Sequence, residues 1–270
     1  MARAVIFDAS AGTPSSSSEV IVENPLSNYL EKGYHDIAGW LWMPAVEATL
    51  TLAAIQTAKV AAGPVCEIGV WEGRYLSLLS FLPATPQPVL AIDPLIHGGN
   101  REAQVTRLLG NIARYTRRPD LVTLLERDSK TVTAETILNT LGAPCQFVSV
   151  DGDHTMEGAM HDLHLAEAIT APGGIVALDD IPNFSCPGVT EAIVRHALDA
   201  SHTLAPFLLV SNKLFLTQKA FCEEYRRQVI AEAERGEAGE WGQKVLSHRH
   251  RMNALGVPVR FLGEELLVSA

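Results

Sequence analysis

The sequence of 270 residues lacks any apolar run that approaches the roughly 20 residues of a membrane-spanning helix. We expect no N-terminal secretion signal, because Asp8 comes before any long apolar region. Positive charge is scarce: 21 Lys and Arg residues stand against 31 Asp and Glu residues, and the net charge is -10. That balance argues against a nucleic-acid backbone as the substrate. We therefore expect a cytoplasmic protein that acts on a small molecule and has neither nucleic acid nor membrane as a partner.

Cysteine is also rare, and no two cysteines form a C-x-x-C pair. The four cysteines are Cys66, Cys145, Cys186 and Cys222. Two of them, Cys66 and Cys145, fall in expected buried strands, which favours reduced core thiols in a cytosolic protein. Hydrophobic residues make up 47% of the chain. That content is ample for one large α/β domain with additional segments, or for two small domains.

Short apolar segments alternate with helical patterns along the chain. The expected strands are Pro64–Val70, Val89–Asp93, Leu121–Glu126, Phe147–Val150, Ile175–Leu178, Phe207–Val210 and Lys213–Thr217. Thr131 is the expected cap of a helix that ends at Leu141. The last two strands are joined by Ser211-Asn212 and predict a hairpin. The alternation predicts an α/β fold with a mostly parallel, doubly wound sheet and an antiparallel edge hairpin.

Composition divides the chain into three segments: an N-terminal arm with lid helices (1–62), a central α/β domain (63–219) and a C-terminal helical extension with a tail (220–270). Residues 9–19 are rich in Ser and predict a flexible arm. A cluster of aromatic residues follows the arm: Tyr29, Tyr34, Trp40 and Trp42. A lid over the site and ordinary surface packing explain this cluster equally well. The apolar tail after Val257 would pack on its own body or on a second copy, and we expect a homo-oligomer, most simply a dimer.

Two consecutive strands of the central domain end in acids. Asp151, Asp153 and His154 follow Phe147–Val150, and Asp179 and Asp180 follow Ile175–Leu178. A helical pattern joins the two strands, and ligands of open α/β sheets bind beyond the carboxyl ends of the strands. Four acids on one edge repel one another unless a cation lies between them. Ligands that are all oxygen atoms favour Mg²⁺ or Ca²⁺ over Zn²⁺.

The first strand of the central domain leads into a glycine-containing turn. Gly69 and Gly73 bracket this turn, and Asp93 follows 20 positions after Gly73, at a distance that suits a ribose hydroxyl pair. Glu67 stands where a dinucleotide-binding motif has its first glycine. A nicotinamide or flavin cofactor is therefore the less expected ligand.

Four motifs in order carry a family resemblance: E-I-G-V-W-E-G at 67–73, A-I-D-P at 91–94, V-D-G-D-H-T-M-E-G-A-M-H-D-L at 150–163 and P-G-G-I-V-A-L-D-D at 172–180. Together they resemble class I S-adenosylmethionine-dependent methyltransferases. More narrowly, they resemble the metal-dependent family of macrolide-sugar O-methyltransferases and their relatives in cephalosporin biosynthesis. The resemblance covers roughly residues 64–219 and implies a Rossmann-like, seven-stranded sheet in an S-adenosylmethionine-binding catalytic domain.

The resemblance also implies roles for single residues. Glu67, Gly69 and Gly73 would border the methionine part of the cofactor, Asp93 would hold the ribose, and Asp128 and Ser129 would border the adenine. A helix cap is the alternative role for Asp128 and Ser129. Asp151, Asp179 and Asp180 would hold a divalent cation, expected to be Mg²⁺, that lowers the pKa of the acceptor hydroxyl.

His154 follows Asp151 by three residues and is the expected catalytic base, acting together with Asp151. Asp153 would either orient His154 or cap the next helix. The expected activity is O-methylation of a small-molecule hydroxyl, on a sugar, a phenol or a secondary metabolite. Two alternatives stay open: a metal-independent N-methyltransferase, and a protein that binds the cofactor or a glycan without catalysis.

Overall fold

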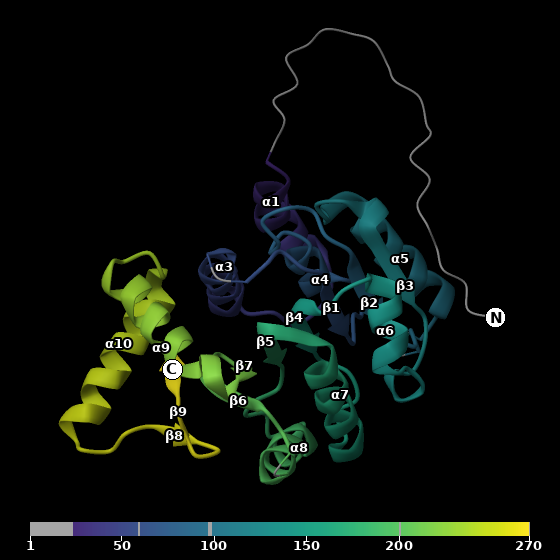
Figure 1. The fold of residues 1–270 in the computed structure, drawn as a ribbon. Helices are drawn as coiled ribbons and strands as arrows, with labels where there is room; N and C mark the ends of the chain where they lie inside the picture. The colour runs from purple at the N-terminus through teal and green to yellow at the C-terminus, as the bar shows by residue number, and fades with distance from the viewer. Residues whose placement is uncertain (1–23, 59, 97–98, 200, 270) are drawn as a thin grey trace, which may run out of the picture.

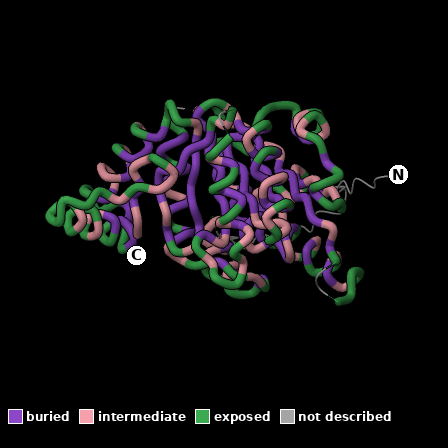
Figure 2. The backbone as a smooth tube through the Cα atoms, turned by 90° about the horizontal axis from the view of Figure 1, so that it is seen from below, coloured by how far each residue is buried: buried purple, intermediate pink, exposed green. Residues whose placement is uncertain are grey.

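An eight-stranded sheet forms the centre of the computed structural model, which describes residues 24–58, 60–96, 99–199 and 201–269 (Figure 1). The strand order is β10-β6-β7-β5-β4-β1-β2-β3. The strands are β1 (Val65–Ile68), β2 (Val89–Ile92), β3 (Val122–Leu125), β4 (Cys145–Val150), β5 (Thr170–Leu178), β6 (Leu204–Val210), β7 (Lys213–Gln218) and β10 (Leu267–Ser269). Most of their residues are buried, and Figure 2 shows the buried backbone in the middle of the molecule. The predicted α/β class and mostly parallel sheet are confirmed.

The hairpin lies inside the sheet, and the sheet has one strand more than the predicted seven. β7 runs antiparallel to both β5 and β6, and β10 pairs parallel to β6 through Leu267↔Leu208. The tail of the chain therefore covers the edge that the hairpin would have left open. Short strands with alternating apolar residues have the same pattern whether they lie at an edge or inside, so the sequence did not distinguish the two.

Helices cover both faces of the sheet, as a doubly wound fold requires. One face packs α3 (Met43–Thr57), α4 (Arg74–Leu79), α5 (Arg101–Tyr115), α9 (Lys219–Glu234) and α10 (Gly239–Ala254). The other face packs α6 (Ala134–Leu141), α7 (Met156–Ile169) and α8 (Pro187–Leu198). Along β4, Phe147 contributes to the first core and Val148 to the second, which is the two-residue period of a strand buried on both sides. Because both faces are covered, side chains that meet a ligand must extend beyond the strand ends.

Shorter elements complete the chain. They are α1 (Pro25–Asn28), the π-helical η1 (Tyr29–Gly33), α2 (Tyr34–Asp36), the 3-10 helices η2 (Pro119–Leu121) and η3 (Ser129–Thr131), and the two-stranded sheet of β8 (Arg260–Phe261) and β9 (Glu264–Glu265). The expected cap Thr131 belongs to η3, and Thr133 caps α6 through its bond from Thr136 N. No helix in the described part of the chain is long and apolar enough to span a bilayer.

The three predicted segments share one hydrophobic core. Val46 of α3, Phe147 of β4, Trp241 of α10 and Leu267 of β10 all belong to it. The tail packs on its own chain, which removes the reason for expecting a dimer, and the homo-oligomer stays a prediction. The boundaries at 62 and 219 stay predictions as well. The predicted arm at residues 9–19 lies outside the described residues.

Candidate active site

The carboxyl ends of four neighbouring parallel strands bring the predicted site residues to one edge of the sheet. β1 and β2 pair in register from Val65↔Val89, and β4 pairs with both β1 and β5. Asp93 therefore follows β2 beside the turn after β1, while Asp151 and Asp179 follow β4 and β5. The prediction that Asp151 and Asp179 converge required their strands to be neighbours, and the pairing of β4 with β5 confirms that they are.

A glycine is required at position 69, where the turn after β1 contacts the loop after β4. Its φ is +82°, and a Cβ placed there would lie 1.8 Å from the backbone oxygen of Asp151. We expected this glycine to make room for a ligand, but the space is filled by the β4 loop. Gly69 thus brings the turn after β1 into contact with the loop that carries Asp151 and His154.

Asp93 holds the same turn in place. Its Oδ2 atom accepts hydrogen bonds from Val70 N (2.8 Å) and Trp71 N (2.9 Å), and its Oδ1 atom accepts one from Leu95 N (2.6 Å). A carboxylate offers about four acceptor positions, so about one is left for a ribose hydroxyl. The structure thus gives Asp93 a structural role that the sequence did not indicate, and its predicted contact with ribose stays a prediction.

Glu67 is a buried acid whose charge is incompletely compensated. It is 3% exposed, and its Oε2 atom has no hydrogen-bond partner among the described residues. Burial raises the pKa of Glu67 well above its usual value, and Asp151 and Asp179 add to this, although the charge of Lys213 lowers it. A cationic group beside Oε2 would satisfy this carboxylate.

The loop after β3 lies beside the loop after β4. Lys130 Nζ bonds Asp153 Oδ2 at 2.8 Å and thereby connects the two loops. Asp128 caps η3 by accepting from Lys130 N at 2.9 Å, so the predicted alternative of a helix cap is confirmed for this residue. Ser129 is buried. Asp153 Oδ1 accepts from Thr155 N at 2.9 Å, in the turn before α7. The cap of α7 is Thr155, whose hydroxyl accepts from Gly158 N, so the predicted capping role of Asp153 is wrong.

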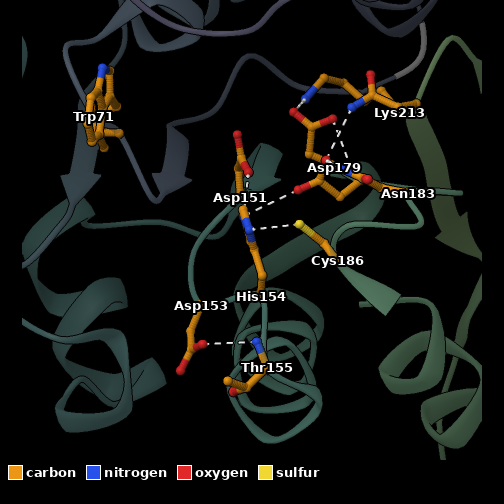
Figure 3. A network of polar contacts seen from close by, with 12 residues as sticks. Trp71, Asp151, Asp153, His154, Thr155, Asp179, Asn183, Cys186 and Lys213 are labelled. Atoms are coloured by element: carbon orange, nitrogen blue, oxygen red, sulfur yellow. Dashed lines mark hydrogen bonds and ion pairs between the residues drawn. The ribbon is translucent and has the colours of Figure 1, made fainter. Parts of the chain in front are cut away.

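His154 lies between two carboxylates and a thiol (Figure 3). Its Nε2 atom is 3.4 Å from Asp151 Oδ1 and 3.3 Å from Asp180 Oδ2, and its Nδ1 atom is 3.2 Å from Cys186 Sγ. The two carboxylates favour the tautomer with its proton on Nε2, which leaves Nδ1 as the acceptor. The hydrogen bond to Asp151 raises the pKa of His154, although burial opposes this.

Asp151 and His154 form a coupled pair. Burial raises the pKa of Asp151 to about 7, with Asp179 adding to the effect, while the contact with His154 lowers it. About a third of the Asp151 side chain is still exposed, as is nearly half of His154. Two neighbouring groups whose pKa values are both raised and that face solvent can exchange a proton with a bound ligand.

Lys213 is, with Cys186, a residue of the site to which the sequence analysis gave no role. It is 1% exposed, and its Nζ atom lies 2.8 Å from Asp179 Oδ2. The acids of this edge require a cation, and the chain itself provides one, from a strand 34 residues after Asp179. The sequence signal was a lone lysine directly before the apolar residues Leu214–Leu216 of its strand.

The predicted three-carboxylate Mg²⁺ site does not fit this arrangement. Asp179 is already ion-paired, and Asp180 Oδ1 accepts from Asn183 Nδ2 at 2.7 Å. Within the described residues, the three potential ligands whose donor atoms lie within 4.8 Å of one another are His154, Asp180 and Cys186, not the three aspartates. Nitrogen and sulfur donors suit Zn²⁺ better than Mg²⁺. We therefore derive no step through a magnesium ion.

The N-terminal aromatic segment reaches the turn after β1. Arg74, at the start of α4, donates to Ile37 O (2.7 Å) and to Gly39 O (2.6 Å). This anchors Trp40, whose ring centroid lies 6.4 Å from that of Trp71 and which is 85% exposed. Tyr29, in contrast, is fully buried. The cluster thus divides: Tyr29 packs in the core and Trp40 lies exposed beside Trp71, while a lid over the site stays a prediction.

Comparisons with known proteins agree with this architecture. Residues 66–181 match a family model described as a methyltransferase domain. An uncharacterized protein, R132, of Acanthamoeba polyphaga mimivirus is 28% identical over 134 residues, which are 49% of this chain and 58% of that protein. The chain thus spans little more than half the length of this curated relative.

Solved structures share the fold at low sequence identity. The O-methyltransferase from Bacillus cereus in complex with SAH has a TM-score of 0.52 at 15% identity, over 73% of this chain and 92% of that chain. CalS11, a TDP-rhamnose 3'-O-methyltransferase of calicheamicin biosynthesis, has a TM-score of 0.50 at 16% identity, over 74% and 88%. The match over residues 66–181 is thus to a methyltransferase domain, and the solved structures show that the chain has a fold found in O-methyltransferases.

Proposed function

We propose that this chain transfers the methyl group of S-adenosylmethionine to a hydroxyl oxygen of a small molecule. The observation that carries the proposal is the coupled pair of Asp151 and His154, which lies beyond the sheet edge where this fold binds ligands. O-methyltransferase is also the activity named for the Bacillus cereus and calicheamicin proteins that share the fold. Small-molecule substrates and a cytoplasmic location belong to the proposal.

The chain's own residues fit the cofactor. Glu67, with its unpartnered Oε2 atom, would bind the ammonium of the methionine part. The turn from Gly69 to Gly73, which Asp93 holds in place, would border the same part, and the loop of Asp128 and Ser129 would border the adenine. When bound, S-adenosylmethionine supplies a methyl group whose bond to sulfur breaks, with the electron pair left on sulfur, as the acceptor oxygen bonds the carbon.

His154 would take the proton of the acceptor hydroxyl at Nδ1. Asp151 and Asp180 face the other ring nitrogen and stabilise the imidazolium that forms. Cys186 lies at Nδ1 in this structure, so the acceptor hydroxyl would take over the contact of the thiol. The remaining task of the site is to hold donor and acceptor in line, which accounts for much of the acceleration of such a displacement.

Exposed aromatic side chains suggest where the acceptor would bind. Trp40 lies beside Trp71, and Phe184, four residues after Asp180, is 98% exposed. Aromatic side chains bind the apolar faces of sugars as well as planar rings. The polar groups of such a ligand are then free to form hydrogen bonds that orient it. Sugars, phenols and ring-bearing secondary metabolites are therefore the acceptors to test.

Mass spectrometry with S-adenosylmethionine that carries a deuterated methyl group tests the proposal. Incubation with a panel of hydroxyl acceptors should transfer the labelled methyl group to oxygen. His154→Ala should lower turnover about 10²–10⁴-fold, the usual range for a positioned base, and cofactor binding should persist. A labelled product on nitrogen would favour the N-methyltransferase alternative. Tight cofactor binding without any product from a broad panel would favour a binding protein.

A further inference from the structure

Lys213 carries a permanent positive charge among the acids of the active site. Its Nζ atom lies 2.8 Å from Asp179 Oδ2 and 4.2 Å from the centroid of the Tyr75 ring. A lysine is protonated at neutral pH unless it is buried without a partner, and Asp179 provides that partner. The side chain is therefore an ammonium at neutral pH, and it is buried where solvent cannot screen its charge.

Strand pairing fixes the position of this ammonium. Leu178 of β5 pairs with Leu214 of the antiparallel β7, so Asp179 and Lys213 form the next pair along the two strands. Beside them, Ile181 N donates to Asn212 O at 2.8 Å and holds the two chain segments together. The ion pair thus joins two paired strands of the sheet, and the burial of Lys213 keeps its ammonium beside Asp179.

A fixed ammonium here changes which ions the aspartates can bind. A divalent cation held by Asp179 would lie within a few ångströms of Nζ, and the repulsion between such charges in a partly buried site is large. Figure 3 shows Lys213 directed toward Asp179 on one side, while His154 and Cys186 approach from another. The acids therefore already have the compensating charge that a metal ion would otherwise have to provide.

On the methyltransferase function proposed above, we infer that Lys213 takes the place of a divalent cation and that methyl transfer here needs no metal ion. Lys213 is a positioning residue, because it acts through its ion pair with Asp179 and through the attraction of its charge for the carboxylates of Glu67 and Asp151. With the acidic edge partly neutralised, His154 can serve as the base without a Lewis acid. Replacing Lys213 by a neutral residue should then convert the edge into a site for a divalent cation.

Electron paramagnetic resonance with Mn²⁺ as the probe tests this inference directly, because the signal of the free ion disappears on binding. The full-length wild type should show no stoichiometric uptake. Lys213→Met, which keeps the length of the side chain but not its charge, should gain one ion per chain and bind it about 10²-fold more tightly or better. The double variant Asp179→Asn/Lys213→Met should lose that gain, since it removes a ligand together with the ammonium.

Lys130→Met is the matched control. This substitution removes a different lysine, which is exposed and ion-paired to Asp153 at the same edge of the sheet. It should create no Mn²⁺ site. Uptake of one Mn²⁺ per chain by the wild type that Asp179→Asn abolishes would overturn the inference. So would a folded Lys213→Met variant without any gain. If Lys213→Met does not fold, the comparison of wild type and Asp179→Asn decides alone.

Chelation provides the second measurement. Turnover of the wild type, verified as metal-free after treatment with EDTA, should equal that of the untreated protein. Loss of turnover on chelation and its return with Mg²⁺ would contradict the inference. The Mn²⁺ titration needs no methyl acceptor. A failure to observe methyl transfer would therefore count against the proposed function, but it would not change what the titration shows about Lys213.

Discussion

The Nδ1 atom of His154 lies 3.2 Å from the Sγ atom of Cys186, so the thiol occupies the place beside Nδ1 that the acceptor hydroxyl would take. Alkylation of Cys186 with N-ethylmaleimide should therefore abolish turnover by blocking Nδ1. The other three cysteines are buried and should react slowly. Burial and the nearby Asp180 raise the pKa of Cys186, so the reaction should become faster with rising pH.

Peptide mass mapping identifies the modified residue, and Cys186→Ala is the control, since it should be resistant to the reagent. If the wild type is fully modified at Cys186 and works at an unchanged rate, the acceptor does not approach His154 from this side.

Turnover should rise with pH through the titration of His154. Its pKa is raised above 6.5, and only the neutral ring can accept a proton, so activity should be low at pH 6 and increase above the raised value. Asp151→Asn removes the contact that raises this pKa and should move the profile to lower pH. A pH–rate series on both proteins measures this, and profiles that coincide would show that another group is titrating.

The far end of α7 offers a test of stability that is separate from catalysis. Burial would raise the pKa of Glu167, but hydrogen bonds from His196 and Thr203 outweigh it and lower the pKa to about 2. This contribution is fully present above the unfolded value near 4.5 and is lost as pH falls through about 2.

Glu167→Gln should therefore melt about 2–4 °C lower at pH 7, the shift that about 1 kcal/mol causes in a domain of this size. The difference should shrink as the pH falls from about 4.5 toward 2. Calorimetric melts across this range provide the measurement. A difference that grows on acidification would have the wrong sign for a carboxylate that is stabilised in its charged form.

Trp40 should contribute to acceptor binding rather than to the chemical step. Trp40→Ala should raise the KM of the acceptor about three- to tenfold, since an aromatic contact is worth about 0.5–1.5 kcal/mol. The kcat and the KM of the cofactor should change little. Trp42→Ala, which removes another exposed indole two residues further on, is the control. Equal effects of both substitutions would point to a general loss of the segment's packing.

Local sequence patterns predicted the parts of the site that lie within one strand and the turn after it. Glu67 with its glycines, Asp151 with His154, and Asp179 with Asp180 each follow a short apolar run, so their place at the carboxyl edge could be read from the chain. The class of the fold followed from the same alternation of strands and helices.

Contacts between distant segments could not be predicted in this way. Lys213 meets Asp179 only because β7 pairs with β5 in one register, and a sequence does not state its register. The same holds for Cys186, which a turn brings to His154, and for Leu267, which pairs with Leu208 at the edge of the sheet. The predicted Mg²⁺ site rested on the number of acids at this edge. It did not include the positive charge of Lys213, which compensates part of their negative charge.

Calorimetric titration with S-adenosylhomocysteine tests the central claim most directly. The wild type should bind one molecule per chain, and Glu67→Gln should weaken binding by about 1.5–3 kcal/mol, as expected when a hydrogen bond to a charged group is lost. Glu167→Gln, remote from the site, should bind as the wild type does. Absence of binding to the wild type, or preferential binding of NAD, would contradict the account.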